Sequence, residues 1–312
     1  MPGKKKIEID GKVVELSHLD KVFFPDSRLT KGDMVEYYRR IADTMVPHMV
    51  DRAVAMKRFP DGMEGDSFFH KNVPDYFPDW IKTVTIEKEN GKLHQLVVND
   101  AATLVYIANQ ACITPHIWLS RADKLHYPDK LIFDLDPSDD DFEPIQNCAK
   151  DIRDFLEDEL GLKTYVMTTG SRGLHVVVPL DASVEFDEVR TFARRVAKLL
   201  SSRKPDDYTI ETLIKKRRGR IFLDYLRNSY AQTSVAPYSV RARPGAPVAT
   251  PLSWDEVGKS SLNARTYTIE NIFRRLGNKE DPWKDFFGHR QSIKSAKNKL
   301  DELNKDETGG FD

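Results

Sequence analysis

The sequence predicts a mixed α/β (α+β) fold, because two kinds of apolar pattern alternate along it. Short apolar runs typical of buried strands occur at residues 131–133 and 176–178. Other segments have apolar residues at every third or fourth position, as at residues 34–45, which indicates helices. The chain has 312 residues, of which 40% are hydrophobic and 31% charged, as is ordinary for a soluble globular protein. This length allows one large domain or two closely associated ones.

Composition also limits the cellular setting. The two cysteines, Cys112 and Cys148, cannot form a disulfide framework and make no CxxC motif, so we expect a reducing cytoplasm. The basic residues 4–6 are followed by an alternating segment rather than an apolar block, which argues against a signal peptide. No apolar run reaches membrane-spanning length.

Acidic and basic residues are segregated although the formal net charge is only −1. Residues 134–160 carry eleven Asp or Glu against two Lys or Arg, whereas residues 201–250 carry ten Lys or Arg against four Asp or Glu. Such a division is what a metal site facing a polyanion requires, although solvated helix faces could produce part of it.

In the first 125 residues the patterns predict two hairpins, two helices and further strands. Asp10 and Gly11 mark the turn of the first hairpin, Thr30 is a plausible N-cap for the first helix, and Asp100 caps the second. The expected hairpins span residues 7–16 and 83–98, and the expected separate strands span residues 53–59 and 114–119.

Two lysines lie close to the first helix. Lys21 precedes it and Lys31 is in its first turn, where a cation opposes the helix macrodipole. Together with free helix N–H groups they would make a phosphate pocket. Two ordinary surface lysines are the alternative, and spacing alone favours it.

Adjacent aromatic residues follow the strand at residues 53–59. Phe68 and Phe69 would point to opposite faces of a strand, so one could enter the core while the other stacks on a nucleic-acid base. That both belong to the core is equally compatible with the pattern.

Paired carboxylates end the apolar run at residues 131–133. Asp134 and Asp136 are two positions apart and therefore share one face of the strand, which ends at Pro137. Two such carboxylates repel each other unless a cation lies between them. A single Asp-x-Asp is common by chance, and a solvated turn is the alternative.

A glycine-containing loop lies between the predicted strands 164–167 and 176–179. Glycine allows backbone N–H groups to approach an anion, and the hydroxyl and cationic side chains around it suit a phosphate. A plain hairpin turn is the alternative, but it would require neither the arginine nor the histidine. The loop residues of interest are Thr169, Ser171, Arg172 and His175.

The second half also has a third isolated carboxylate, Asp224, which follows three apolar residues in a predicted strand at residues 221–228. A charge at the end of a buried strand is costly unless it is paired or binds a metal. Helices are expected at residues 142–160, 186–200 and 269–276, a basic loop at 215–220, and a proline-rich extended segment, too basic for the core, at 236–251. Residues 291–312 are charged and expected to fray, and no linker separates independent domains.

Three aspartates at strand ends suit two hard divalent cations with oxygen ligands. In a polymerase-type site of this kind, one metal activates a 3′-hydroxyl and the other neutralises the triphosphate.

The ordered motifs resemble a known family. D134-L-D136, T169-G-S-R172-G-L-H175, D224-Y-L-R227-N and A-P-Y-S-V-R241-A-R243-P-G-A-P are similar to motifs of the polymerase domain of prokaryotic DNA ligase D. That domain belongs to the archaeo-eukaryotic primase superfamily and serves non-homologous end joining. The resemblance covers roughly residues 15–290.

The resemblance implies a fold and a domain organisation. It implies a primase-type core of two mixed or antiparallel sheets with flanking helices, one sheet forming an RRM-like palm. Residues 1–290 would be the catalytic domain, with 15–125 mainly binding DNA ends and template, and 126–250 mainly forming the metal and nucleotide site.

The resemblance also implies roles for individual residues. Asp134, Asp136 and Asp224 would bind metal. Thr169 and Arg172 stand where Ser and Lys are expected in the family, and they keep the donor and the charge. The residues implied to bind nucleotide are His116, Thr169, Ser171, Arg172, His175, Arg227 and Arg241.

Further residues are implied to bind DNA. Lys21 and Lys31 would grip a 5′-phosphate, with His18 at a position where relatives often have Asn. Arg58 and Phe69, or Phe68, would contact the template. Residues 83–94 and 213–220, the latter with Arg217 and Arg220, resemble two mobile loops that position the primer and bridge broken ends.

The implied activity is template-dependent extension of 3′ ends and filling of short gaps at 5′-phosphorylated breaks. Ribonucleotides and manganese, or magnesium in its place, would be preferred, with two ions per site. NTP or dNTP would be the substrates, Ku and a DNA ligase are possible partners, and a cytoplasmic, nucleoid-associated protein is expected. The chain has no Lys-x-Asp-Gly motif, so it is expected to be a free-standing polymerase or an excised domain.

Two other functions remain open from the sequence. One is a primase of the same superfamily that starts strands de novo. The other is a non-catalytic module that binds DNA ends, with solvated aspartates.

Overall fold

The computed structural model describes residues 4–88, 91–137 and 141–308. The chain divides into two compact units. Unit 1 comprises Met1–Asp123, Thr233–Thr250 and Arg265–Lys279, and unit 2 comprises Lys124–Gln232, Pro251–Ala264 and Glu280–Asp312. Both units therefore contain segments that are distant in the sequence. No helix of the described ranges is long and apolar enough to cross a membrane.

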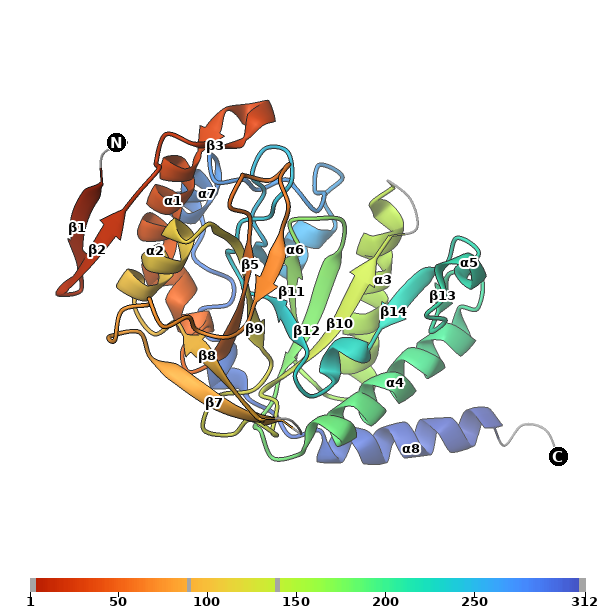
Figure 1. Ribbon diagram of the computed structural model, residues 1–312. Helices are drawn as coiled ribbons and strands as arrows, with labels where there is room; N and C mark the ends of the chain where they lie inside the picture. The colour runs from red at the N-terminus through yellow and green to blue at the C-terminus, as the bar shows by residue number, and fades with distance from the viewer. Residues whose placement is uncertain (1–3, 89–90, 138–140, 309–312) are drawn as a thin grey trace. The chain divides into compact units, whose positions relative to one another are not determined.

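Unit 1 is built on an antiparallel sheet with strand order β15-β9-β5-β8-β7, and β6 pairs with β5 beyond this path (Figure 1). Helices α1 and α2 pack against each other. The elements of unit 1 are β1 Lys5–Ile9, β2 Lys12–Leu16, β3 Val22–Phe24, β4 Leu29–Thr30, α1 Lys31–Met45, β5 Ala53–Arg58, β6 Phe68–His70, β7 Thr83–Lys88, β8 Gly91–Val97, α2 Ala101–Asn109, β9 Cys112–Trp118, β15 Thr233–Val235 and α7 Ile272–Asn278.

Unit 2 is built on a sheet with strand order β13-β14-β10-β12-β11-β16, antiparallel except for the β13–β14 pair. Helix α3 packs against β10, β12 and β14, and α4 packs against β10 and β13 (Figure 1). The elements of unit 2 are β10 Lys130–Asp136, α3 Glu143–Asp154, the π-helical turn η3 Phe155–Glu159, β11 Tyr165–Thr168, β12 Leu174–Pro179, α4 Phe186–Arg203, β13 Tyr208–Thr209, α5 Ile214–Arg217, β14 Ile221–Asp224, the 3₁₀ turn η4 Leu226–Asn228, β16 Pro251–Leu252, α6 Trp254–Val257, the 3₁₀ turn η5 Phe286–His289 and α8 Lys294–Thr308.

The first helix begins where the sequence predicts. The Thr30 hydroxyl accepts the Asp33 N–H, and the Asp33 carboxylate accepts the Thr30 N–H, which completes a capping box. Asp100 caps α2 in a similar way by accepting the Thr103 N–H. The predicted hairpins are present as β1–β2 and β7–β8, although the expected turn residues 89–90 lie outside the described residues.

The prediction that residues 236–251 stay out of the core is wrong. Tyr238, Val240 and Val248 are fully buried in unit 1. Two tyrosines of α1 satisfy the backbone of this segment: Tyr37 donates to the Tyr238 carbonyl, and the Tyr38 hydroxyl accepts the Val240 N–H. Hydrogen bonds with side chains distant in the sequence therefore add to the backbone hydrogen bonds within the segment, such as that from Tyr238 N–H to the Ala249 carbonyl.

The C-terminal segment was expected to fray, yet residues 294–308 form α8. Ile293, Ala296 and Leu300 are buried, and their spacing of three and four residues defines one helical face. Arg195 of α4 donates to Asp301 at 2.5 Å, and Figure 1 shows α8 beside α4. Contacts with α4 thus stabilise a helix whose composition alone is too polar to predict it.

The capping box offers a stability test. A Thr30→Ala change removes the oxygen that accepts the Asp33 N–H, and we expect the free energy of unfolding to fall by about 0.5–2 kcal/mol, measured by urea denaturation. Thr30→Ser retains this oxygen and is the matched control. Equal losses in both variants would show that the methyl group, not the cap, is responsible.

Candidate active site

Three strands of unit 2 bring the predicted catalytic residues together. Antiparallel pairing places Asp134 of β10 directly opposite Asp224 of β14 on one side and opposite His175 of β12 on the other. Directly opposed residues share a face of the sheet, and Asp136 shares it because it lies two positions after Asp134. The three aspartates and the histidine therefore project from one face.

Two cationic or proton-donating side chains contact Asp134, which is 6% exposed. His175 Nε2 lies 3.2 Å from one carboxylate oxygen, and Arg227 Nε donates to the other at 3.0 Å. The same Arg227 nitrogen is 3.9 Å from Asp224. Burial acts to raise the pKa of Asp134, but His175 and Arg227 more than offset it and hold that pKa below its ordinary value.

The other two aspartates shift in the opposite direction. Partial burial, and then the charge of Asp134, raise the pKa of Asp136. Burial also raises the pKa of Asp224; the Leu226 N–H, which donates to its carboxylate at 2.7 Å, opposes this shift, and the charge of Asp134 adds to it. For both carboxylates, burial and the charge of Asp134 thus outweigh the effect of the nearby cations on the pKa.

The donor set suits a divalent cation, although the side chains are not arranged as a closed ligand cage. Among the described residues, no three Asp, Glu, His or Cys side chains converge closely enough to hold an ion. Arg227 instead lies within 4 Å of both Asp134 and Asp224. Carboxylate oxygens on one face, two of them with pKa values raised by burial and then by the charge of Asp134, fit hard cations that would add to this compensation.

The glycine loop next to this site is held by its own hydrogen bonds. The Thr169 hydroxyl accepts N–H groups from Ser171 and Gly173 at 3.3 and 3.2 Å, and Thr169 N–H donates to the Gly173 carbonyl. Arg172 is exposed and reaches back to the Pro137 carbonyl at 3.3 Å, and its charge lowers the pKa of Asp136. The loop therefore brings its arginine close to the end of β10.

Two of the predicted nucleotide-binding residues, His116 and Arg241, belong to unit 1. His116 is on β9 opposite Ala55 and Val235, and its ring lies 5.3 Å from that of Phe69. Arg241 N–H donates to the Pro247 carbonyl. Their roles, like those of the residues in unit 2, stay predictions.

The sequence analysis missed Lys57, which lies among these residues. Its ammonium group is 5.7 Å from the Phe69 ring. Burial, and then the charges of Arg241 and Arg243, lower the pKa of Lys57. The available signal was strand alternation, because β5 directs Lys57 and its neighbour Arg58 to opposite faces.

Neither phenylalanine of β6 belongs to the core: Phe68 is 46% and Phe69 51% exposed. Both rings lie on a strand of three residues that pairs with β5. Arg58 lies opposite Phe68, with its guanidinium group 5.6 Å from the ring, and also contacts the His70 ring and the Tyr76 hydroxyl. Both rings are therefore available for stacking.

Lys21 and Lys31 lie close together, but the helix N–H groups beside them are not free. Lys31 N–H donates to the Lys21 carbonyl, and Gly32 N–H donates to the Leu19 carbonyl. The expected contribution of free N–H groups is therefore wrong, because the capping box and the segment that precedes β3 already use them. Lysine side chains remain: Lys31 Nζ donates to the Ser17 carbonyl, and Lys21 Nζ pairs with Asp61 at 2.6 Å.

Lys31 is held in an unfavourable environment for a cation. The residue is 5% exposed, and burial, followed by the charges of Lys21 and Arg58, lowers its pKa to about 8. The exposed His18 nearby has a φ of +53°, a left-handed conformation that Asn adopts more readily than most residues. This explains why Asn suits the same position.

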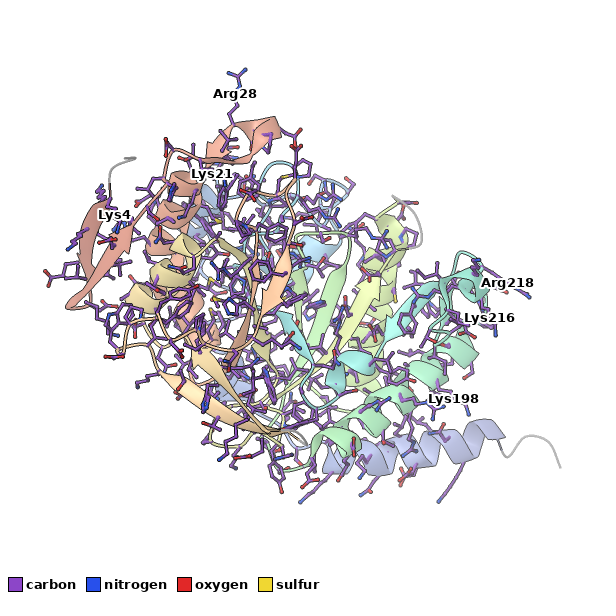
Figure 2. The ribbon with its side chains drawn as sticks, in the orientation of Figure 1. Lys4, Lys21, Arg28, Lys198, Lys216 and Arg218 are labelled. Atoms are coloured by element: carbon purple, nitrogen blue, oxygen red, sulfur yellow. The ribbon has the colours of Figure 1, made fainter. Side chains whose placement is uncertain are left out.

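Arg217 and Arg220 bind their own loop. Arg217 donates to the carbonyls of Glu211 and Thr212, and Arg220 donates to those of Pro205, Lys216 and Arg217. The exposed cations of this segment are others: Figure 2 shows the side chains of Lys216 and Arg218 at α5. The loop thus presents its two lysines, Lys215 and Lys216, and a different arginine, Arg218, to solvent.

Known proteins with similar sequences belong to one family. The sequence model of the family described as "LigD, primase-polymerase domain" matches residues 30–283. The chain is 32% identical over 280 residues to the bifunctional non-homologous end joining protein LigD of Bacillus subtilis, covering 89% of this chain and 45% of that protein. It is 34% identical over 266 residues to the multifunctional LigD of Mycolicibacterium smegmatis, covering 84% of this chain and 34% of that protein.

A solved structure is also similar. The polymerase domain from Mycobacterium tuberculosis ligase D in complex with DNA has a TM-score of 0.83 and 30% sequence identity, covering 89% of this chain and 99% of that one. This match confirms the predicted fold class. The chain spans less than half the length of the two curated relatives.

The close approach of the loop to β10 can be tested at Gly173. A Cβ there would lie 1.7 Å from the Leu135 carbonyl oxygen, so Gly173→Ala must separate β12 from β10 and move His175 away from Asp134. We expect a loss of about 1–3 kcal/mol in unfolding free energy by urea denaturation. Gly277→Ala is the control, because its Cβ would meet nothing within 4 Å. A Gly173→Ala variant as stable as the control would contradict the close approach.

Proposed function

The chain belongs to the LigD primase-polymerase domain family, and from this we propose that it is a template-dependent nucleotidyltransferase that extends 3′ ends during DNA end joining. It fills short gaps at 5′-phosphorylated breaks and prefers ribonucleotides. The observation that carries the proposal is the strand register that sets Asp134 opposite Asp224 and His175. The relatives' names and the DNA complex of the M. tuberculosis domain support DNA as the partner.

Asp134, Asp136 and Asp224 would hold the metal, two ions of Mn²⁺ or Mg²⁺ per site. When bound, the ions supply activation of a 3′-hydroxyl and neutralisation of the triphosphate charge. Arg227, which contacts Asp134 and approaches Asp224, would then be released to face the nucleotide phosphates. A rigid guanidinium fork suits this second role.

The glycine loop would hold the triphosphate of an NTP or dNTP. Arg172 is exposed beside Asp136 and provides charge, while His175 is fixed by Asp134 and has a defined position. Thr169 keeps the loop in shape through its hydroxyl, and Ser171 adds a donor. In unit 1, His116 and Arg241, with Lys57 beside them, are the further residues proposed to bind nucleotide.

The DNA end would bind unit 1. Lys21 and Lys31, with His18 beside them, form the proposed 5′-phosphate pocket, and Lys31 is near enough to Lys21 for the charge of Lys21 to help lower its pKa. Arg58, Phe68 and Phe69 offer one guanidinium group and two exposed rings to the template strand. Ku and a DNA ligase are the protein partners consistent with end joining.

The activity is tested by incorporation of nucleotide with manganese on a 5′-phosphorylated gapped duplex. Asp134→Asn and Asp224→Asn each keep the side-chain shape and remove a charge from the site. We expect incorporation to fall to background while DNA binding, measured by fluorescence anisotropy, persists. Asp206→Asn, an exposed residue of the same unit, is the matched control.

The outcome separates the alternative functions. Dinucleotide synthesis without extension of a preformed primer would favour a de novo primase. DNA binding with no incorporation by the wild-type protein would favour a non-catalytic end-binding module.

The 5′-phosphate preference should depend on pH through Lys31. Its pKa is about 8 in the unbound protein, and a phosphate dianion favours the protonated amine. The preference for a 5′-phosphate over a 5′-hydroxyl end should therefore be fully present below pH 8 and decline as the pH rises above it, measured by anisotropy. Lys31→Arg, which stays charged, should flatten this decline. A wild-type preference that stays constant from pH 7 to 9.5 would exclude Lys31 from the pocket.

A further inference from the structure

One face of α4 carries an unbroken row of exposed cations outside the site described above. Arg190, Arg194 and Lys198 are all exposed and follow one another at intervals of four residues. Residues four apart lie on the same side of a helix, about 6 Å apart along its axis, so the row is about 12 Å long. None of the three forms an ion pair or hydrogen bond with any described residue.

Of the four other charged residues of α4, three are paired with described residues and only Asp187 is not, which sets this row apart. Arg195 donates to Asp301 of α8, Glu188 accepts from Lys297 of α8, and Arg203 pairs with Glu159 of η3. The opposite face of the helix is buried, with Val189, Val196 and Leu200 in the core. The row therefore occupies the solvent-facing side, and Figure 2 shows Lys198 extending outward from α4.

Helix stability does not account for the row. Like charges at i and i+4 destabilise a helix, and the row contains two such pairs. Arg190 is also near the helix N-terminus, where the macrodipole disfavours a cation. The one acid on this side, Asp187, lies in the first turn and forms no ion pair. A chain with a net charge of −1 has enough acids to neutralise such a row, yet it leaves these three cations unpaired.

We propose that this row, Arg190, Arg194 and Lys198, binds the phosphate backbone of a duplex DNA arm that extends from the site of synthesis. Duplex DNA carries one charge per about 1.7 Å of its axis, so a 12 Å row can face several phosphates at once. Helix α4 packs against β10, which carries Asp134, and against η4, which carries Arg227. The row therefore lies on a helix that packs against two elements of the candidate active site. This inference rests on the proposed function, because it takes DNA as the substrate.

The test is the salt dependence of DNA binding. The variant R190Q/R194Q/K198Q removes the three charges and keeps good helix-forming residues. For a 5′-phosphorylated gapped duplex with long arms, we expect the slope of log Kd against log salt, measured by fluorescence anisotropy, to fall by about 2–3 units. On a substrate with short arms, supplied at saturation, nucleotide incorporation should be unchanged.

The control is K259Q/K294Q/K299Q, which removes three exposed lysines elsewhere in unit 2 and alters the net charge equally. A loss of slope in the first variant alone supports the row as a DNA contact. Equal slopes for the two variants would overturn the proposal. This outcome includes the case in which the row binds an acidic protein instead of DNA. If the wild-type protein does not bind DNA at all, the proposed function fails as well, and the two failures are thereby distinguished.

Discussion

The antiparallel pairing of β10 with β14 and β12 is the constraint on which the candidate site depends. It sets Asp224 and His175 on either side of Asp134 without any loop having to close over them. A shift of one residue in either pairing would turn these side chains to the opposite face of the sheet. The register is fixed by the apolar residues that precede each carboxylate, such as Phe133 and Leu223, which are fully buried. The hydrophobic core of unit 2 therefore determines where the charges lie.

This arrangement buries carboxylates, which disfavours their charged form. The pKa values of the three aspartates are shifted as a result. Asp134 is stabilised as an anion by His175 and Arg227, whereas Asp136 and Asp224 are not fully compensated. Burying a carboxylate without a partner is strongly unfavourable, so one arginine shared between two carboxylates is a minimal solution. Such a site is stable enough to fold, and it favours the entry of further positive charge.

Much of this could be predicted from the sequence, because the strongest signals were local. An apolar strand ending in an aspartate identified Asp134, Asp136 and Asp224, and the register brings these residues together. The helix caps at Thr30 and Asp100 could also be predicted, because a cap involves residues only three positions apart.

The features that could not be predicted depend on residues distant in the chain. The burial of residues 236–251 depends on hydroxyl groups from α1, and the existence of α8 depends on its contact with α4. The charges of Arg241 and Arg243 help lower the pKa of Lys57, and they lie near it only in the folded chain. The orientation of Arg217 likewise depends on the folded loop, because its side chain donates to the carbonyls of Glu211 and Thr212.

Several residues with proposed functions are also residues at which charges of one sign are close together and not neutralised. Where a charge only supports the fold, an opposite charge meets it, as Asp100 meets Lys12 at 2.6 Å between α2 and β2. At Asp136 and Asp224 negative charges crowd together, and at Lys31 and Lys57 positive charges do. Each crowded group lowers the stability of the fold, since like charges repel most strongly where water is excluded. A bound partner of opposite charge removes that repulsion, so the carboxylates suit cations and the lysines suit phosphates. The two kinds of crowding lie on different elements, the carboxylates on β10 and β14 and the lysines on α1 and β5, so within each element the crowded charges have one sign.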